Sequence, residues 1–184
     1  MELVDRFDNK RMPLNKVTER YDRVRGELRQ SVHLWIRNSK GEFLIQQRSF
    51  TKKVFPGQWS ITGGAVDAGE TPLAAVKREC KEELGVDLDE DNLTLVLSFI
   101  RELDFVDVFW LNQDVNLEDV KMEPSEVIDI AYKTPEEIRK MMDDKNFTPS
   151  VEFYYDMMLK TYDYYIEHGG NVFDKDGNLL PHLK

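Results

Sequence analysis

The segment from Gly63 to Val86, GGAVDAGETPLAAVKRECKEELGV, constrains the fold more than any other part of the chain. Thr71 and Pro72 form a typical helix start, as N-cap and first helical residue, and Gly85 is a typical helix stop. Four apolar residues recur between them at helical spacing: Leu73, Val76, Cys80 and Leu84. The sequence therefore predicts one amphipathic helix whose apolar stripe packs against the rest of the fold.

Strand-like runs flank this helix on both sides. The expected strands cover residues 2–6, 32–37, 42–48, 59–62, 93–100, 106–112 and 126–134. Residues 38–41 read as a hairpin loop, and residues 17–29 remain unassigned. Two further helices are expected, one from Pro135 and one over residues 151–168, ended by Gly169 and Gly170. This order predicts an α/β fold in which a mixed sheet lies between helices.

Composition narrows the function classes. The chain of 184 residues has a net charge of −10, which disfavours general binding to nucleic acid or to an anionic membrane. An anionic substrate would need metal ions or a local basic patch. One cysteine excludes an internal disulfide, and the charged N-terminus resembles no secretory signal. No apolar run reaches membrane-spanning length, and we expect a cytoplasmic protein.

Three glutamates, Glu79, Glu82 and Glu83, fall within an arc of about 100° on one face of the predicted helix. Concentrated carboxylates of this kind suit Mg²⁺ or Mn²⁺, which could clamp a polyphosphate and help to deprotonate a water. The alternative is a solvated acidic face whose glutamates pair with Arg78 and Lys81. Gly63 and Gly64 favour the ligand site, because they let the backbone pass close to a ligand, and Gly69 allows a tight turn into Glu70.

The segment resembles the signature of the Nudix family, the Nudix box. Its fixed positions are occupied here by Gly64, Glu70, Arg78, Glu79, Glu82, Glu83 and Gly85, followed by the aliphatic Val86. The one departure is Cys80, where the family usually has an aliphatic residue; a buried cysteine behaves as a small hydrophobe. The resemblance implies a Nudix-type α/β/α sandwich and hydrolysis of a nucleoside diphosphate linked to another group.

The resemblance also implies roles for individual residues. Glu79, Glu82 and Glu83, with the carbonyl of Gly63, would bind Mg²⁺ or Mn²⁺. Arg78 would orient the glutamates, and Glu70 would tie the loop to the helix. In some members of the family a later loop supplies the base or a further ligand, and Glu126, near Glu123, is the best candidate here. The alternative for Glu126 is an exposed acid before a strand.

Residues 2 to about 140 further resemble the Nudix branch related to isopentenyl-diphosphate isomerase. Relatives in that branch use basic residues in the loop occupied here by Arg48, Lys52 and Lys53, which are candidates for binding the diphosphate; ordinary surface charge is the alternative. The isomerase uses a cysteine and a histidine-containing metal site, but residues 60–64 contain neither residue. Hydrolysis is therefore favoured over isomerisation, and a non-catalytic nucleotide-binding module is the third reading.

We expect residues 1–184 to form a single Nudix domain with its core at about 28–145 and a helical extension at about 149–168. The partner is expected to be a small-molecule diphosphate, with no nucleic-acid polymer and no membrane. A homodimer is compatible with the sequence, and the C-terminal helix either packs on the sheet or forms a dimer contact. His33, on a strand, reads as a core or surface histidine rather than a ligand.

Overall fold

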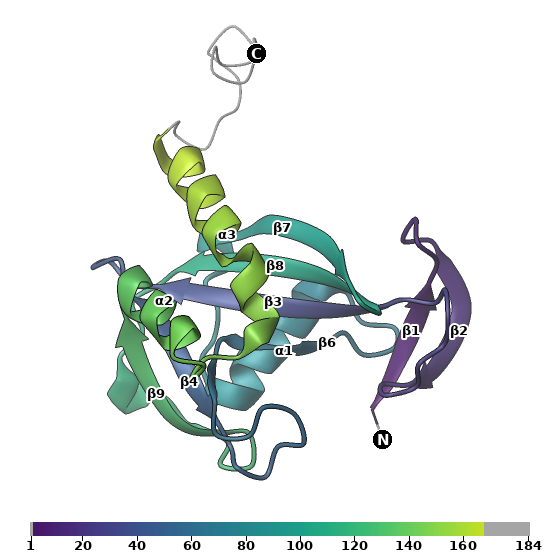
Figure 1. Ribbon diagram of the computed structural model, residues 1–184, viewed down its shortest axis with the longest axis horizontal. Helices are drawn as coiled ribbons and strands as arrows, with labels where there is room; N and C mark the ends of the chain where they lie inside the picture. Colours follow the sequence, from purple (N-terminus) through teal and green to yellow (C-terminus); the bar gives the residue numbers. More distant parts are fainter. Residues whose placement is uncertain (1, 168–184) are drawn as a thin grey trace, which may run out of the picture. The chain divides into compact units, whose positions relative to one another are not determined.

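A computed structural model describes residues 2–167 of the chain, with side chains described as far as residue 161 (Figure 1). It contains two compact units, one ending at Thr148 and the other beginning at Pro149. All the strands and the first two α-helices belong to the first unit. The described part of the second unit is a single helix, α3 (Pro149–Glu167).

The main sheet of the first unit is mixed. Its strands run in the order β5 (Trp59–Ser60), β4 (Phe43–Arg48), β3 (Arg29–Arg37), β8 (Asp104–Asn112) and β7 (Leu93–Arg101). In addition, β9 (Val127–Lys133) pairs with β4, and β6 (Thr62–Ala65) pairs with β3. The β3–β8 pair is parallel and the other pairs are antiparallel. The predicted α/β fold with a mixed sheet is confirmed, and β3 is its central strand.

One face of the sheet is covered by α1 (Pro72–Leu84), which lies behind β3 in Figure 1. The hydroxyl of Thr71 accepts a hydrogen bond from the Ala74 N–H at 3.2 Å, and Gly85 ends the helix at φ 68°. Val76, Cys80 and Leu84 are buried as predicted. The prediction for Leu73 is wrong: it shares the angular position of the stripe, but its place in the first turn leaves it 43% exposed.

Aromatic side chains fill the opposite face. Trp35 alternates with the residues of β3 that face α1, and so points to the other side of the sheet. Its ring contacts Phe43 at a centroid distance of 5.1 Å and stacks on Phe147 at 6.5 Å. Phe147 follows α2 (Pro135–Asp143), whose buried residues are Ile138 and Met142. The two helices of the first unit therefore cover different faces of the sheet.

A hairpin that the sequence did not fully predict precedes the main sheet. It pairs β1 (Leu3–Phe7), expected at residues 2–6, with β2 (Pro13–Glu19), which was not predicted. Nearly all residues of β2 are exposed, so the strand has no alternation of apolar and polar residues to reveal it. The side chain of Arg6 is buried within the hairpin, where it donates to Thr18 and to the Asp22 carbonyl.

The remaining elements match the expected order. Two short 3₁₀ helices, η1 (Glu90–Asn92) and η2 (Leu117–Asp119), flank β7 and β8 in the chain. The predicted helix at residues 151–168 is α3, and the glycines expected to end it lie outside the described residues. None of the helices in residues 2–167 is both long and apolar enough to cross a membrane.

Candidate active site

The glutamates of α1 meet the glycine strand β6. Gly63 and Gly64 pair with His33 and Val32 of the central strand, so the position of the glycine backbone is fixed by the sheet. A Cβ added to Gly64 would overlap the carboxylate of Glu79. The N–H of Gly63 donates to Glu83 Oε2 at 3.3 Å. The two carboxylates therefore lie directly against the glycine pair, an approach that needs residues without side chains.

Arg78 lies at the centre of the acidic cluster. Its guanidinium donates to both oxygens of Glu70, at 3.1 and 3.0 Å, and to Glu79 at 2.9 Å and Glu82 at 3.1 Å. It also donates to the Ala65 carbonyl at 3.0 Å. Burial alone would lower the pKa of Arg78, but its bond to Glu70 and the charge of Glu79 raise it. One cation thus connects the loop before α1 to two of its glutamates.

The three glutamates, which the sequence predicted to share one face of the helix, occupy different environments. Glu82 is exposed, and the side chain of Glu79 is mostly buried. Glu83 is only 5% exposed, and it accepts a hydrogen bond from the buried amide of Gln46 at 2.8 Å. Burial and the charge of Glu79 raise the pKa of Glu83 to about 8, although the bonds from Gln46 and Gly63 oppose this. Burial likewise raises the pKa of Glu79, opposed by Arg78.

Glu126 approaches the site from the loop before β9. The Lys52 ammonium donates to its carboxylate, and the Glu126 carbonyl accepts from the Ser49 N–H at 2.8 Å. Its charge is among the influences that raise the pKa of Glu83, so the two acids lie close enough to interact. Glu123 is turned to its own loop, where its carboxylate accepts from Ser125 at 3.0 Å. The structure thus pairs Glu126 with Lys52, and the charge of Glu126 acts on Glu83.

The other predicted cations lie differently. Arg48 Nε donates to the Val54 carbonyl at 3.1 Å, which holds the shape of its own loop. Lys53 is exposed on that loop. Gln46 is a site residue that the sequence analysis missed. The available signal was a pair of glutamines directly after the apolar strand residues FLI, because an inward amide needs a buried partner.

The donor set fits a hard divalent cation. All the candidate side-chain ligands are carboxylates, and Glu83 is a buried carboxylate whose raised pKa reflects burial and a neighbouring negative charge. Within residues 2–167, no three His, Cys, Asp or Glu side chains are arranged closely enough to hold a metal ion as they stand. Arg78 supplies the positive charge instead, through its bonds to Glu79 and Glu82. Metal binding would require these glutamates to exchange part of that contact for the ion.

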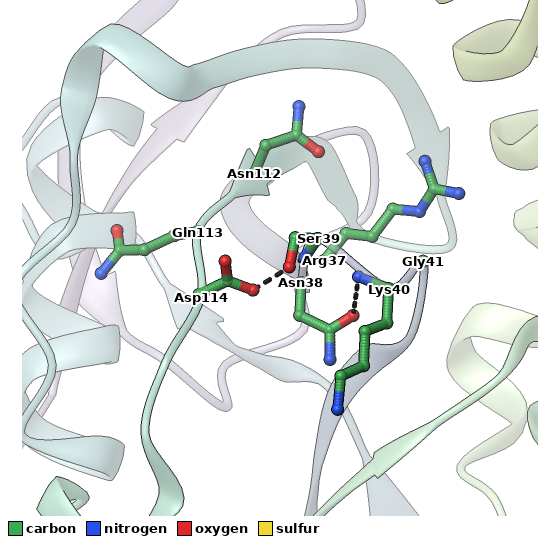
Figure 2. Close-up of a pocket in the computed structure, with 8 residues that line it drawn as sticks. All are labelled: Arg37, Asn38, Ser39, Lys40, Gly41, Asn112, Gln113 and Asp114. Carbon is green, nitrogen blue, oxygen red and sulfur yellow. Dashed lines mark hydrogen bonds between the residues drawn. The ribbon is translucent and has the colours of Figure 1, made fainter.

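A separate depression of about 430 Å³ lies at the β3–β4 loop and the end of β8 (Figure 2). Several of its polar groups hold the loop in its own conformation. Asp114 accepts from the Ser39 N–H at 2.8 Å, and Asn38 Oδ1 accepts from the N–H groups of Lys40 and Glu42. These contacts stabilise a turn, and the depression contains none of the candidate active-site residues.

Comparison with known proteins agrees with this site. The family model of the Nudix domain matches residues 27–153, and the chain belongs to this family. An uncharacterised Nudix hydrolase of Listeria innocua is 36% identical over 125 residues, which cover 67% of this chain and 74% of that protein. The crystal structure of DR0079 from Deinococcus radiodurans superposes with a TM-score of 0.72 at 25% identity, covering 88% of this chain and 99% of that one.

The protein is therefore a Nudix hydrolase, an enzyme of a family that cleaves diphosphate bonds in small nucleoside diphosphate derivatives and generally uses divalent metal ions. The match to the isomerase branch covers a smaller part of the chain. An isopentenyl-diphosphate isomerase of Corynebacterium diphtheriae is 40% identical over 57 residues, which span 30% of this chain and 31% of that protein. This partial match agrees with membership of the same family.

Proposed function

We propose that this protein hydrolyses the diphosphate linkage of a nucleoside diphosphate derivative with Mg²⁺ or Mn²⁺ bound by Glu79, Glu82, Glu83 and the Gly63 carbonyl. The observation that carries the proposal is the convergence of the α1 carboxylates on the Gly63–Gly64 backbone, with Arg78 holding two of them in place. Such a group of acids is costly to assemble unless a cation joins it.

The reaction is attack of water on one phosphorus. A new P–O bond forms, the bridging P–O bond breaks, and the water proton leaves to a base. The bound ions would neutralise the diphosphate and acidify the water. Gln46 and the Gly63 N–H orient Glu83, Arg78 orients Glu79 and Glu82, and Lys52 supplies a positive charge beside Glu126. Glu126 is the proposed general base or additional ligand, and Lys52 must release it for that role.

Isomerisation of a prenyl diphosphate is the second candidate, supported by the partial match to an isomerase. Residues 60–64 contain no cysteine or histidine, and the only thiol, Cys80, is buried with its pKa raised to about 12. We therefore propose that the chain is a hydrolase related to the isomerase branch, and not an isomerase. Incubation with isopentenyl diphosphate, followed by NMR for the allylic isomer, tests whether the protein is an isomerase.

The deciding experiment is a panel of nucleoside diphosphate derivatives and prenyl diphosphates, incubated with Mg²⁺ and with Mn²⁺ and analysed by chromatography for the monophosphate products of diphosphate cleavage. We expect turnover of at least one nucleoside derivative, and losses of at least about 100-fold for Glu82→Gln and Glu83→Gln. Glu90→Gln, which removes an exposed carboxylate paired to Lys77, is the matched control and should leave turnover unchanged. Tight binding of a panel member without turnover would instead support the non-catalytic module.

We further propose that the chain acts as one Nudix domain over residues 1–184, with its core at about 28–145, and that it works in the cytoplasm. The family match at residues 27–153 supports the core boundaries. A homodimer is compatible with the sequence. Light scattering of the purified protein would decide between monomer and dimer.

A further inference from the structure

The N-terminal hairpin is fastened to the loop that leads into α1. The Leu3 carbonyl accepts from the Ala68 N–H at 2.9 Å, and the Asp5 carboxylate accepts from the Gly69 N–H at 2.7 Å. The next residue, Glu70, is the acid that grips Arg78. The hairpin therefore lies beside the glutamate cluster, although its residues precede the Nudix box by more than forty positions.

Arg20 follows the last residue of β2 on this hairpin. Its backbone N–H donates to the Glu2 carbonyl at 2.9 Å, and its guanidinium forms an ion pair with the Glu2 carboxylate. The Arg20 side chain is 29% exposed, whereas that of Glu2 is 55% exposed. The guanidinium also lies 5.5 Å from the ring centre of Tyr21, which is itself 63% exposed. The Arg20 guanidinium is thus held by the Glu2 carboxylate and remains partly exposed to solvent.

The charge of Arg20 interacts with an acid of the active site, on the side where the hairpin joins the loop before α1. The pKa of Arg20 is raised: burial would lower it, but Glu2 first, and also Glu79, stabilise its charge. Burial would raise the pKa of Glu2, yet Arg20 and then Lys52 lower it. The charge of Arg20 therefore favours the ionised form of Glu79, and the charge of Lys52, the lysine paired with Glu126, favours the ionised form of Glu2.

The Arg20–Glu2 ion pair is not needed to hold the hairpin closed. Backbone pairing of β1 with β2 already does so, and the Arg20 carbonyl accepts from the side chain of Arg29. An ion pair in which one partner is more than half exposed contributes little to stability. A guanidinium, in contrast, is well suited to phosphate, because its planar fork can donate two parallel hydrogen bonds to phosphate oxygens.

We propose that Arg20 is a substrate-binding residue that contacts the diphosphate, and that Glu2 holds this guanidinium until the substrate displaces it. The proposal rests on the proposed hydrolysis at the α1 glutamates. It adds a cation from outside the Nudix box. Arg20 and Lys52 together offset the repulsion between an acidic site and an anionic substrate.

Steady-state kinetics with the best substrate of the panel test this role. For Arg20→Gln we expect KM to rise about tenfold with kcat changed less than about twofold, since a ground-state contact to the diphosphate is lost. For Glu2→Gln we expect KM to fall, because the competing carboxylate is gone. Lys16→Gln is the control: Lys16 lies on the same hairpin in an ion pair with Glu27, and its loss should change neither constant.

The opposite changes in KM expected for Arg20→Gln and Glu2→Gln distinguish a substrate-binding role from a structural role. If the ion pair only supports the hairpin, Arg20→Gln and Glu2→Gln will change KM in the same direction, and the proposal is overturned. Arg20→Lys should recover part of the affinity, because it restores the charge without the fork. Circular dichroism melts of all variants should agree within a few degrees, since an ion pair with one partner more than half exposed contributes little to stability.

A binding measurement distinguishes failure of this inference from failure of the proposed hydrolysis. Inorganic pyrophosphate is titrated calorimetrically into the wild type and the variants in the presence of Ca²⁺, so that no turnover is required. Weaker binding by Arg20→Gln, with normal binding by Lys16→Gln, supports the role of Arg20 even if no panel member is hydrolysed. Equal affinity of wild type and Arg20→Gln, or no binding by the wild type, overturns it even if hydrolysis is confirmed.

Discussion

Cys80 is the only thiol in the chain, but its environment in the fold suppresses the reactivity expected of a thiol. It stands among acids in the sequence, yet its side chain is fully buried in the core against the sheet. Burial first, and then the charges of Glu83 and Asp87, raise the pKa of this thiol to about 12. The thiolate is the reactive form of cysteine, so position and charge both suppress reactivity here.

We therefore expect Cys80 to resist alkylation in the folded protein. With a pKa of about 12, the thiolate fraction at pH 8 is on the order of one in ten thousand. Iodoacetamide should modify the native protein at least about 100-fold more slowly than the protein unfolded in guanidinium, as followed by mass spectrometry. The unfolded sample is the control, and similar rates in the two states would show that the thiol is accessible.

His33 should make the fold sensitive to acid. Burial, followed by the charge of Arg101, lowers the pKa of His33 to about 3 from its ordinary value of 6.5. A lowered pKa means that the unfolded chain takes up the proton first. The contribution of His33 to stability is therefore complete above pH 6.5 and is lost progressively as the pH falls from 6.5 towards 3.

Urea unfolding at pH 8 and pH 5 measures this effect. Protonation of the unfolded histidine at pH 5 costs the wild type about 2 kcal/mol of unfolding free energy, by linkage. His33→Gln cannot titrate, so its loss between the two pH values should be smaller by about that amount. The comparison uses the change with pH within each protein, which cancels the packing cost of the substitution. An identical pH dependence in both proteins would contradict the assignment.

At the scale of elements, β6 and α1 act as a pair. Gly64 leaves room for the Glu79 carboxylate, and the crowded atoms belong to the end of a flexible side chain. We expect Gly64→Ala to push Glu79 aside and to reduce turnover by at least about tenfold while costing little stability, as measured by kinetics and thermal melting on the same samples.

Gly41→Ala is the matched control for this prediction. Gly41 lies in the β3–β4 loop at φ 83°, a backbone conformation that L residues rarely adopt. Its replacement should cost about 1 kcal/mol of stability and leave turnover unchanged, the reverse of the pattern expected for Gly64→Ala. If the two variants lose activity in proportion to stability alone, the close approach of Glu79 to β6 has no catalytic importance.

The elements also show what sequence reasoning can reach. The ends of α1 were predictable because Thr71, Pro72 and Gly85 act locally. The strand β2 was not, because its exposed residues have no periodic pattern and it exists through pairing with β1. The burial of Glu83 depends on Gln46, thirty-seven positions earlier, and on the Gly63 backbone. The motif identified which acids cluster, but only the tertiary fold separates the buried acid from the exposed one.

For the whole molecule, the central problem is charge. A chain of net charge −10 binds no anion by its overall field, so local cations must reverse the sign at the site. Arg78, Lys52 and Arg20 come from α1, from the loop after β4 and from the hairpin, and each is paired with a carboxylate. The acids outnumber these cations, which leaves an excess of negative charge that a divalent cation would neutralise.

Metal binding should therefore stabilise the folded protein. An ion that binds only the native state raises the unfolding free energy by about 2.7 kcal/mol at one hundred times its dissociation constant. We expect the melting temperature to rise with Mg²⁺ or Mn²⁺ and to saturate, while NaCl at the same ionic strength gives no such rise. Glu83→Gln should lose this response without being less stable in the absence of metal, because the raised pKa of Glu83 means that the fold disfavours the charged form of this side chain. An equal rise in wild type and Glu83→Gln would show that the ion binds elsewhere.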